Sequence, residues 1–193
     1  MTAPEGNEIP TVRYLIDKSS SKFTVRAFAG GMLSALGHSP TFGIRKFEGE
    51  IEFAPQEAGT SSLRLAVEAD SLEVMDDISS KDRREIEGTM NKDVLESAKY
   101  PAISFETISA TVNKLGEARY QVSLTGKITL HGVTRQLVIP AQVTEMGDML
   151  RAGGEFPLMQ TNFGIKLVNA AGGTLKVKDE LKFTFDIVAR KPD

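Results

Sequence analysis

Apolar and polar side chains alternate along most of this 193-residue chain. The segment KFEGEIEF, residues 46–53, shows the pattern most clearly, because Phe47, Ile51 and Phe53 alternate with glutamates. Alternation with a period of two places apolar side chains on one face of a β-strand. The same pattern recurs in segments 22–28, 62–69, 103–105, 122–130, 137–143, 156–158 and 183–187. Together these segments indicate about eight strands.

Short turn signals separate these strands, at Gly116, Gly132, Gly147-Asp148 and Gly172-Gly173. Short connections favour an antiparallel meander. Between Thr107 and Ile108 the apolar parity flips, which indicates a β-bulge. An open sheet would expose two edges and an apolar face, whereas a closed barrel exposes neither. The pattern therefore predicts an all-β fold, an eight-stranded antiparallel β-barrel with room for one small ligand.

One stretch lacks the alternation and carries good helix formers. The segments SSKDRREIEGTM (79–90) and NKDVLES (91–97) each begin near a residue suited to cap a helix, Ser79 or Ser80 in the first and Asn91 in the second. One or two short helices are therefore expected around residues 79–97. Residues 1–10 are expected to form a flexible tail, and residues 11–193 a single barrel domain.

Composition narrows the function classes. The chain is 40% hydrophobic and 25% charged with a net charge of -3, values typical of a soluble globular protein with no basic footprint for nucleic acid. It has no cysteine, so disulfides and thiolate metal sites are excluded. No apolar run approaches the ~20 residues of a membrane span. The N-terminus lacks the features of a secretory signal, which favours the cytoplasm, or the periplasm if the sequence is a mature form.

Five segments, in order, resemble the YceI-like family of lipocalin-like, polyisoprenoid-binding proteins. They are YLID (14–17), FEGEIEF (47–53), KDVLESAKYPAISFET (92–107), YQVSLTGKITLHGVTRQLVI (120–139) and TNFGI (161–165). The resemblance implies an extended lipocalin-like barrel that encloses a tunnel for an isoprenoid-tailed lipid or quinone. It also implies a homodimer, and a ligand rather than a cofactor inside the barrel.

A ligand-binding set follows from the large apolar residues on the inward faces and in the SPTFGI and TNFGI elements. It consists of Phe23, Val25, Phe42, Ile44, Leu65, Val67, Ile103, Phe105, Leu124, Ile128, Phe156, Leu158, Asn162 and Phe163. The polar candidates to orient a quinone or phosphate head group are Gln160, Thr161 and Asn162, or else Arg45 and Lys46.

Candidates for catalysis or metal binding are few. Zinc needs three or four ligands, and only His38 and His131 supply imidazole, so no metal site is expected. His131 precedes Gly132 and is interpreted as a turn residue. The carboxylates of Asp76, Asp77, Asp82 and Glu85 are interpreted as a solvated helix face. No nucleophile elbow or phosphate loop occurs.

Three hypotheses for function remain at this point. The first is a non-enzymatic carrier or storage protein for an isoprenoid-tailed lipid or quinone. The second is a protein-interaction or stress-related module whose barrel is filled by side chains. The third, an enzyme or metal protein that uses His38 and His131, has the least support from the sequence.

Overall fold

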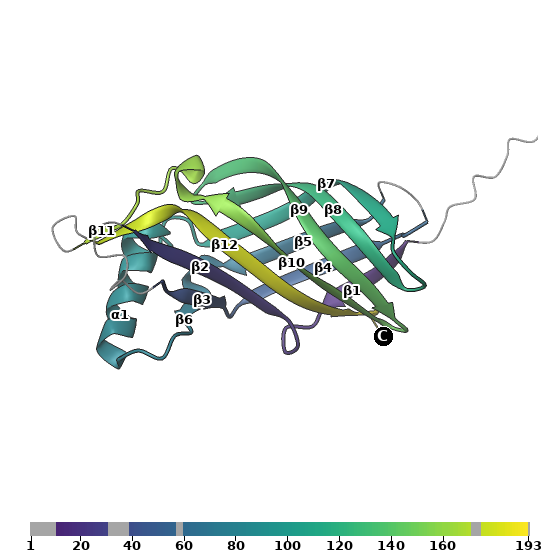
Figure 1. The fold of residues 1–193 in the computed structure, drawn as a ribbon, viewed down its shortest axis with the longest axis horizontal. Helices are drawn as coiled ribbons and strands as arrows, with labels where there is room; N and C mark the ends of the chain where they lie inside the picture. Colours follow the sequence, from purple (N-terminus) through teal and green to yellow (C-terminus); the bar gives the residue numbers. More distant parts are fainter. Residues whose placement is uncertain (1–10, 31–38, 57–59, 171–174, 193) are drawn as a thin grey trace, which may run out of the picture.

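A closed β-barrel dominates the structure, a computed structural model that describes residues 11–30, 39–56, 60–170 and 175–192. The barrel is elongated, and its strands run obliquely along the long axis (Figure 1). Eight strands form the ring, in the spatial order β1 (Val12–Ile16), β4 (Phe47–Phe53), β5 (Ser62–Glu68), β7 (Ala102–Lys114), β8 (Arg119–Leu130), β9 (Val133–Met146), β10 (Met149–Met159) and β12 (Leu175–Arg190). Antiparallel pairing of β1 with β12, through Leu15 opposite Arg190, closes the ring. The predicted eight-stranded antiparallel barrel is confirmed.

Three further strands lengthen the barrel at one end. They are β2 (Lys22–Gly30), β3 (Thr41–Ile44) and β6 (Leu72–Val74). β2 follows β1 and pairs with β12, β3 precedes β4 and pairs with β2, and β6 follows β5 and pairs with β3. Three barrel strands therefore each consist of two segments, interrupted by residues 17–21, residues 45–46 and the 3-10 turn η1 (Ala69–Ser71). A short strand, β11 (Asn169–Ala170), pairs with the start of β12.

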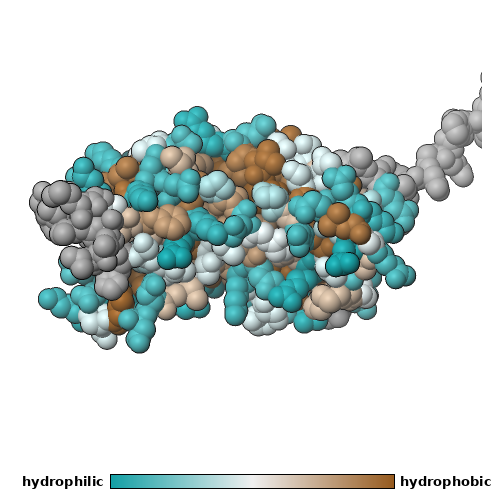
Figure 2. Space-filling model, viewed as in Figure 1, coloured by the Kyte–Doolittle hydropathy of each residue, from teal (hydrophilic) through white to brown (hydrophobic). Residues whose placement is uncertain are grey.

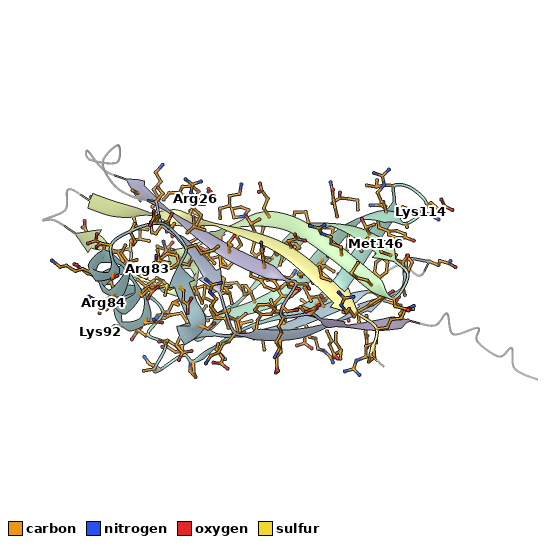
Figure 3. All side chains as sticks on the ribbon, turned by 90° about the horizontal axis from the view of Figure 1, so that it is seen from below. Arg26, Arg83, Arg84, Lys92, Lys114 and Met146 are labelled. Atoms are coloured by element: carbon orange, nitrogen blue, oxygen red, sulfur yellow. The ribbon has the colours of Figure 1, made fainter. Side chains whose placement is uncertain are left out.

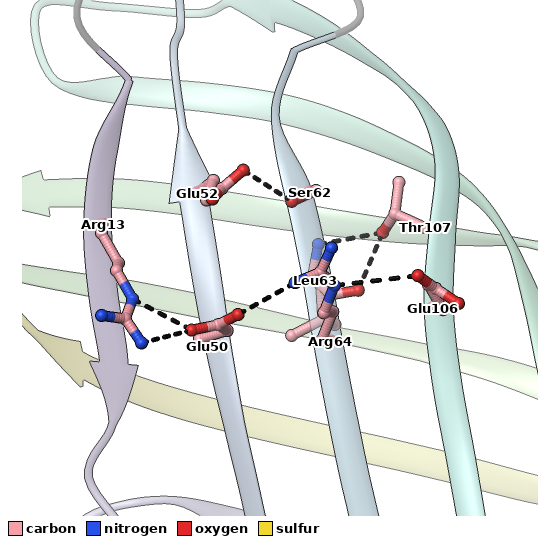
Figure 4. A network of polar contacts seen from close by, with 8 residues as sticks. All are labelled: Arg13, Glu50, Glu52, Ser62, Leu63, Arg64, Glu106 and Thr107. Atoms are coloured by element: carbon pink, nitrogen blue, oxygen red, sulfur yellow. Dashed lines mark hydrogen bonds and ion pairs between the residues drawn. The ribbon is translucent and has the colours of Figure 1, made fainter.

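The predicted bulge lies where the apolar parity flips. The register between β7 and β8 shifts between Thr107 and Ser109, and Ile108 points outward with 52% of its surface exposed. Pairing of β7 with β5 stops at the same place, but the Thr107 hydroxyl accepts a hydrogen bond from the Leu63 N–H (2.9 Å) and donates to the Leu63 carbonyl (3.1 Å). The side chain thus satisfies the backbone groups that the bulge would otherwise leave unpaired (Figure 4).

The outward face beside this bulge is polar. Arg13 and Glu50 form a bidentate contact across β1 and β4, with distances of 2.7 and 2.9 Å. Arg64 on β5 then bridges Glu50 (3.3 Å) and Glu106 on β7 (3.7 Å), so charges alternate across four strands (Figure 4). The Arg13 guanidinium holds the pKa of the Glu50 carboxyl below its usual value. Figure 2 shows hydrophilic residues spread over one side of the molecule, with smaller hydrophobic patches between them. The alternating polar positions therefore face water, and their apolar neighbours face inward.

One helix lies at the end of the barrel that β2, β3 and β6 extend (Figure 1). α1 (Ser80–Thr89) is capped by Ser79, whose hydroxyl accepts a hydrogen bond from the Asp82 N–H. The expected separate second helix with Asn91 as its cap is wrong. α1 continues directly into a π-helical turn, η2 (Met90–Val94), and Asn91 lies inside it. The backbones of Thr89 and Met90 both keep helical angles, so the chain does not leave the helix before Asn91.

Two side chains of α1 tie the helix to the edge strand β6. The Glu87 carboxylate accepts a hydrogen bond from the Val74 N–H at 2.9 Å. The Arg83 guanidinium donates to the carbonyls of Val74 and Asp76. These side chains satisfy backbone groups on the edge of β6 that faces away from β3, so the helix both covers a sheet edge and is fixed at the end of the barrel.

Candidate ligand-binding cavity

The inward side chains do not fill the barrel. They surround a cavity of about 580 Å³, a volume within the range of ligand pockets. Almost every strand of the ring contributes to the wall, and most of the lining is aliphatic or aromatic. The cavity is therefore an apolar chamber that runs along the barrel rather than a surface groove.

Two glycines explain why large phenylalanines leave this space open. Gly126 on β8 faces inward, and a Cβ placed there would lie 2.6 Å from Cε2 of Phe105 on β7. Gly154 on β10 faces Phe185 on β12, and a Cβ there would lie 2.7 Å from Cζ of that ring. Each ring thus occupies the space over a glycine of the neighbouring strand, where a side chain would have to push it aside. The strands keep their aromatic packing, and the middle of the barrel stays empty.

The end of the barrel opposite α1 is closed by aromatic packing. Tyr14, Phe53 and Tyr120 are each at most 5% exposed, and the rings of Phe53 and Tyr120 meet edge to face with centroids 5.2 Å apart. The Tyr120 hydroxyl donates to the Glu145 carboxylate at 2.9 Å. Burial is the largest cause that raises the pKa of Tyr14 and of Tyr120, so both phenols are neutral at physiological pH. Phe53, a member of this layer, also lines the cavity.

At the other end the lining includes solvent-exposed residues of α1, and we place the mouth of the cavity there. The helix turns Asp82, Glu85, Ile86 and Thr89 toward the cavity, residues spaced at three or four positions and thus on one helical face. Asp82 and Glu85 are also exposed to solvent. Asp76, in the segment that leads from β6 to the helix, joins this lining. The mouth is therefore acidic, and the interpretation of Asp82 and Glu85 as only a solvated helix face is incomplete.

Most of the ligand-binding residues expected from the sequence meet in this cavity. Eleven of them are part of its lining, namely Phe23, Val25, Phe42, Ile44, Leu65, Val67, Ile103, Phe105, Leu124, Ile128 and Phe156. Their contact with a ligand remains a prediction. Small residues outside the expected ligand-binding set, such as Ala141 and Ala152, also line the wall, and their small size adds to the free volume.

The structure places the other three expected residues outside the lining. Leu158 and Phe163 are 4% and 2% exposed and belong to the packed core near the 3-10 turn η3 (Gln160–Phe163). Asn162 is exposed, and its carbonyl accepts a hydrogen bond from Arg135 at 2.8 Å. Here the turn reverses the inward direction that simple alternation would give. Gln160 of the same turn does line the cavity, and its amide donates to the Lys178 carbonyl at 2.9 Å.

The remaining head-group candidates are engaged on the outside of the barrel. Thr161 donates to Asp179 at 2.6 Å. Arg45 pairs with Glu73 at 2.8 Å, and Lys46 pairs with Glu68 at 2.8 Å. None of these three residues lines the cavity.

His131 forms a turn and holds three motif segments together. It precedes Gly132 in the two-residue connection between β8 and β9, and both have positive φ, 52° and 71°, as a type I′ hairpin requires. Its ring lies 4.5 Å from that of Tyr100, and its Nδ1 is 3.2 Å from the Phe163 carbonyl. The structure thus gives His131 packing partners that account for its burial. His38 lies outside the described residues, as do Gly172-Gly173 and the tail at residues 1–10.

Other chemistry finds little support in the described ranges. Within them, His, Asp and Glu residues nowhere gather in a group of three or more that could hold a metal ion. No helix in the described part of the chain has the length and apolar character of a membrane span.

The fold and the cavity define a class of protein, the lipocalin-like barrels with an apolar interior. Residues 14–189 match the YceI-like domain. A UPF0312 protein of Pseudomonas syringae pv. tomato is 32% identical over 185 residues, which cover 92% of this chain and 87% of the relative. Protein YceI of Escherichia coli O157:H7 is 28% identical over 136 residues, 70% of this chain and 63% of the relative. The chain therefore belongs to the YceI-like family.

Solved structures agree on the fold. BcnA of Burkholderia cenocepacia aligns with a TM-score of 0.68 and 19% identity, covering 90% of this chain and 98% of that protein. A polyisoprenoid binding domain from Saccharophagus degradans aligns with a TM-score of 0.67 and 13% identity, covering 94% and 99%. The barrel architecture is thus shared even where few residues are identical.

Proposed function

We propose that this protein binds an isoprenoid-tailed lipid or quinone inside the barrel and carries or stores it without changing it chemically. The observation that carries the proposal is the apolar cavity of about 580 Å³, closed by Tyr14, Phe53 and Tyr120 at one end and open beside α1 at the other. A chamber of this shape suits a long apolar tail that enters from the α1 end. The similarity to a polyisoprenoid binding domain supports the same class of ligand.

The driving force would be the hydrophobic effect. Burial of one CH₂ group contributes about 0.8 kcal/mol, so each five-carbon unit contributes roughly 3–4 kcal/mol. Association costs at least about 4 kcal/mol and micromolar binding needs about 8 kcal/mol net, so about three or four buried units are required. Affinity then depends on the apolar wall, and polar groups at the mouth only orient the head.

A cavity-filling experiment tests this proposal. Ala152 on β10 and Ala141 on β9 both line the cavity, and each can be replaced by phenylalanine. Both variants should lose uptake of the neutral apolar dye N-phenyl-1-naphthylamine, whose fluorescence rises in apolar surroundings. Val138→Phe is the matched control, because Val138 lies on β9 but is 56% exposed on the outer face. Equal uptake by all four proteins would place the dye elsewhere and contradict the proposal.

The interaction-module hypothesis has less support. It requires a barrel filled by its own side chains, whereas Phe105 and Phe185 lie against glycines and leave the centre free. Self-association as a homodimer is compatible with either function, and sedimentation of the purified protein would measure it directly.

A further inference from the structure

The charged side chains that line the cavity are all of one sign. Among the described residues they are Asp76, Asp82 and Glu85, all at the mouth beside α1, and no Lys, Arg or His of the described ranges joins them. Glu52 is also part of the lining, but its carboxylate accepts a hydrogen bond from Ser62 on the outward face of β4 and β5. A ligand that enters with its tail first would leave its head group among the carboxylates at the mouth.

Groups that elsewhere bind phosphate are already engaged at this mouth. The N-terminus of α1 offers backbone N–H groups, but Ser79 caps it and the Asp82 carboxylate occupies its first turn. The Arg83 guanidinium donates to the carbonyls of Val74 and Asp76. Figure 3 places Arg83, Arg84 and Lys92 at the α1 end of the barrel, yet none of them is part of the cavity lining.

The helix geometry explains this separation. Residues of α1 that line the cavity recur at positions 82, 85, 86 and 89. Arg84 falls between them, and Lys81 and Lys92 lie just before and after this run, outside the lining. Because Arg83 and Glu87 fix the helix to β6, α1 cannot rotate its basic residues inward without losing those contacts. The acidic face is thus held toward the mouth.

We infer that the mouth selects ligands by the charge of their head group. It admits an uncharged head, such as a hydroxyl or a quinone, or a cationic amine, and it discriminates against a phosphate or diphosphate on the same isoprenoid tail. The inference rests on the proposed function and names its ligand class. The selection acts through Coulomb repulsion between the phosphate and the carboxylates of Asp76, Asp82 and Glu85. This repulsion increases when the head group loses its contacts with water.

Three probes with one tail and different heads test the inference. Farnesol, farnesylamine and farnesyl phosphate compete against N-phenyl-1-naphthylamine below their micelle concentrations at pH 7.5. Farnesylamine should displace the dye at concentrations equal to or lower than those of farnesol, because the carboxylates attract its ammonium group, and farnesyl phosphate should bind more weakly than farnesol by about tenfold or more. Added salt should narrow that difference, because ions screen exposed charges.

Isosteric variants assign the effect to the mouth. Asp82→Asn combined with Glu85→Gln should bring farnesyl phosphate within about threefold of farnesol and leave farnesol affinity unchanged. The control combines Glu48→Gln with Glu117→Gln, which removes the same charge from exposed residues outside the cavity lining. This control variant should keep the full difference in affinity between farnesol and farnesyl phosphate. Retained farnesol binding shows that each variant is folded.

The outcomes separate the two proposals. Equal affinity of all three probes for the wild-type protein, or a difference that both double variants alter equally, would overturn the charge selection and leave lipid binding intact. Failure of every probe, farnesol included, to displace the dye or to bind would overturn the proposed function and this inference with it.

Discussion

Glu96 and His131 lie 35 residues apart, and Oε2 of the glutamate is 2.5 Å from Nε2 of the histidine. They are also the two non-glycine residues with positive φ in the described part of the chain, at 45° and 52°. Positive φ is unfavourable for residues with a Cβ, so surrounding contacts must hold both backbones in place. The side-chain contact joins two strained turns, one after η2 and one between β8 and β9. It links the helical end of the barrel to the longest hairpin.

Removal of the His131 side chain should therefore destabilise the fold. The ring is 11% exposed and faces an acceptor at each nitrogen, Glu96 at Nε2 and the Phe163 carbonyl at Nδ1. His131→Ala leaves both acceptors without their partner and should lower the free energy of unfolding by about 1–3 kcal/mol. Urea unfolding measures the change, with Lys127→Ala on the exposed face of β8 as the control.

The same variant separates a structural role from a chemical one. His131→Ala should still take up N-phenyl-1-naphthylamine, because His131 does not line the cavity. An unchanged urea midpoint together with lost ligand uptake would contradict the structural role.

Gly126 should tolerate no side chain. A Cβ there would lie 2.6 Å from Cε2 of Phe105 and 2.7 Å from the Glu106 carbonyl, so Gly126→Ala must push the Phe105 ring toward the cavity. We expect a loss of about 1–3 kcal/mol in the free energy of unfolding and weaker uptake of the apolar dye. Gly153→Ala is the matched control, because the nearest atom to its Cβ is the Phe185 carbonyl at 3.6 Å. If both variants behave like the wild-type protein, glycine does not keep the cavity open.

Asp17 should make stability depend on pH. It lies in the connection between β1 and β2 and accepts hydrogen bonds from Ser19 and Ser20 and from the Arg190 guanidinium on β12. These donors, those of Ser19 first, hold the pKa of the Asp17 carboxyl well below its usual value. Stability from a lowered carboxyl pKa is complete above the unfolded value, about 3.9, and is lost as the pH falls toward the folded value.

Asp17→Asn should accordingly lower the urea midpoint at pH 7. The difference from wild type should persist down to about pH 4 and shrink below it, where the unfolded chain begins to bind a proton. Asp77→Asn, at an exposed position between β6 and α1, is the control. A difference that stays constant to pH 2, or that grows as the pH falls, would show that the hydrogen bonds to the charged carboxylate do not stabilise the fold.

Alternation alone predicts much of this structure. Phe47, Ile51 and Phe53 are buried as expected, and the parity flip at Thr107 marks a real bulge. Both follow from the strict period of two, which fixes the face of each side chain once a strand is recognised. The pattern also predicts a closed barrel, because closure leaves no strand edge of the sheet exposed.

Features that depend on register or docking could not be predicted this way. The pairing of Gly126 with Phe105 appears only when β7 and β8 are aligned across the bulge. The direction of Glu85 depends on how Arg83 and Glu87 fix α1 to β6, and no local pattern specifies that contact. Phe163 departs from simple alternation because η3 interrupts the strand pattern.

The most direct test of the central claim is to identify what the purified protein carries. The wild-type protein is extracted with organic solvent, the extract is analysed by mass spectrometry, and the lipid is quantified against the protein. The account predicts an isoprenoid-tailed lipid or quinone in near-stoichiometric amount, retained by Val138→Phe and absent from Ala152→Phe. An extract free of apolar lipid from a wild-type protein that also takes up none when offered, or equal lipid in the cavity-filled variant, would contradict it.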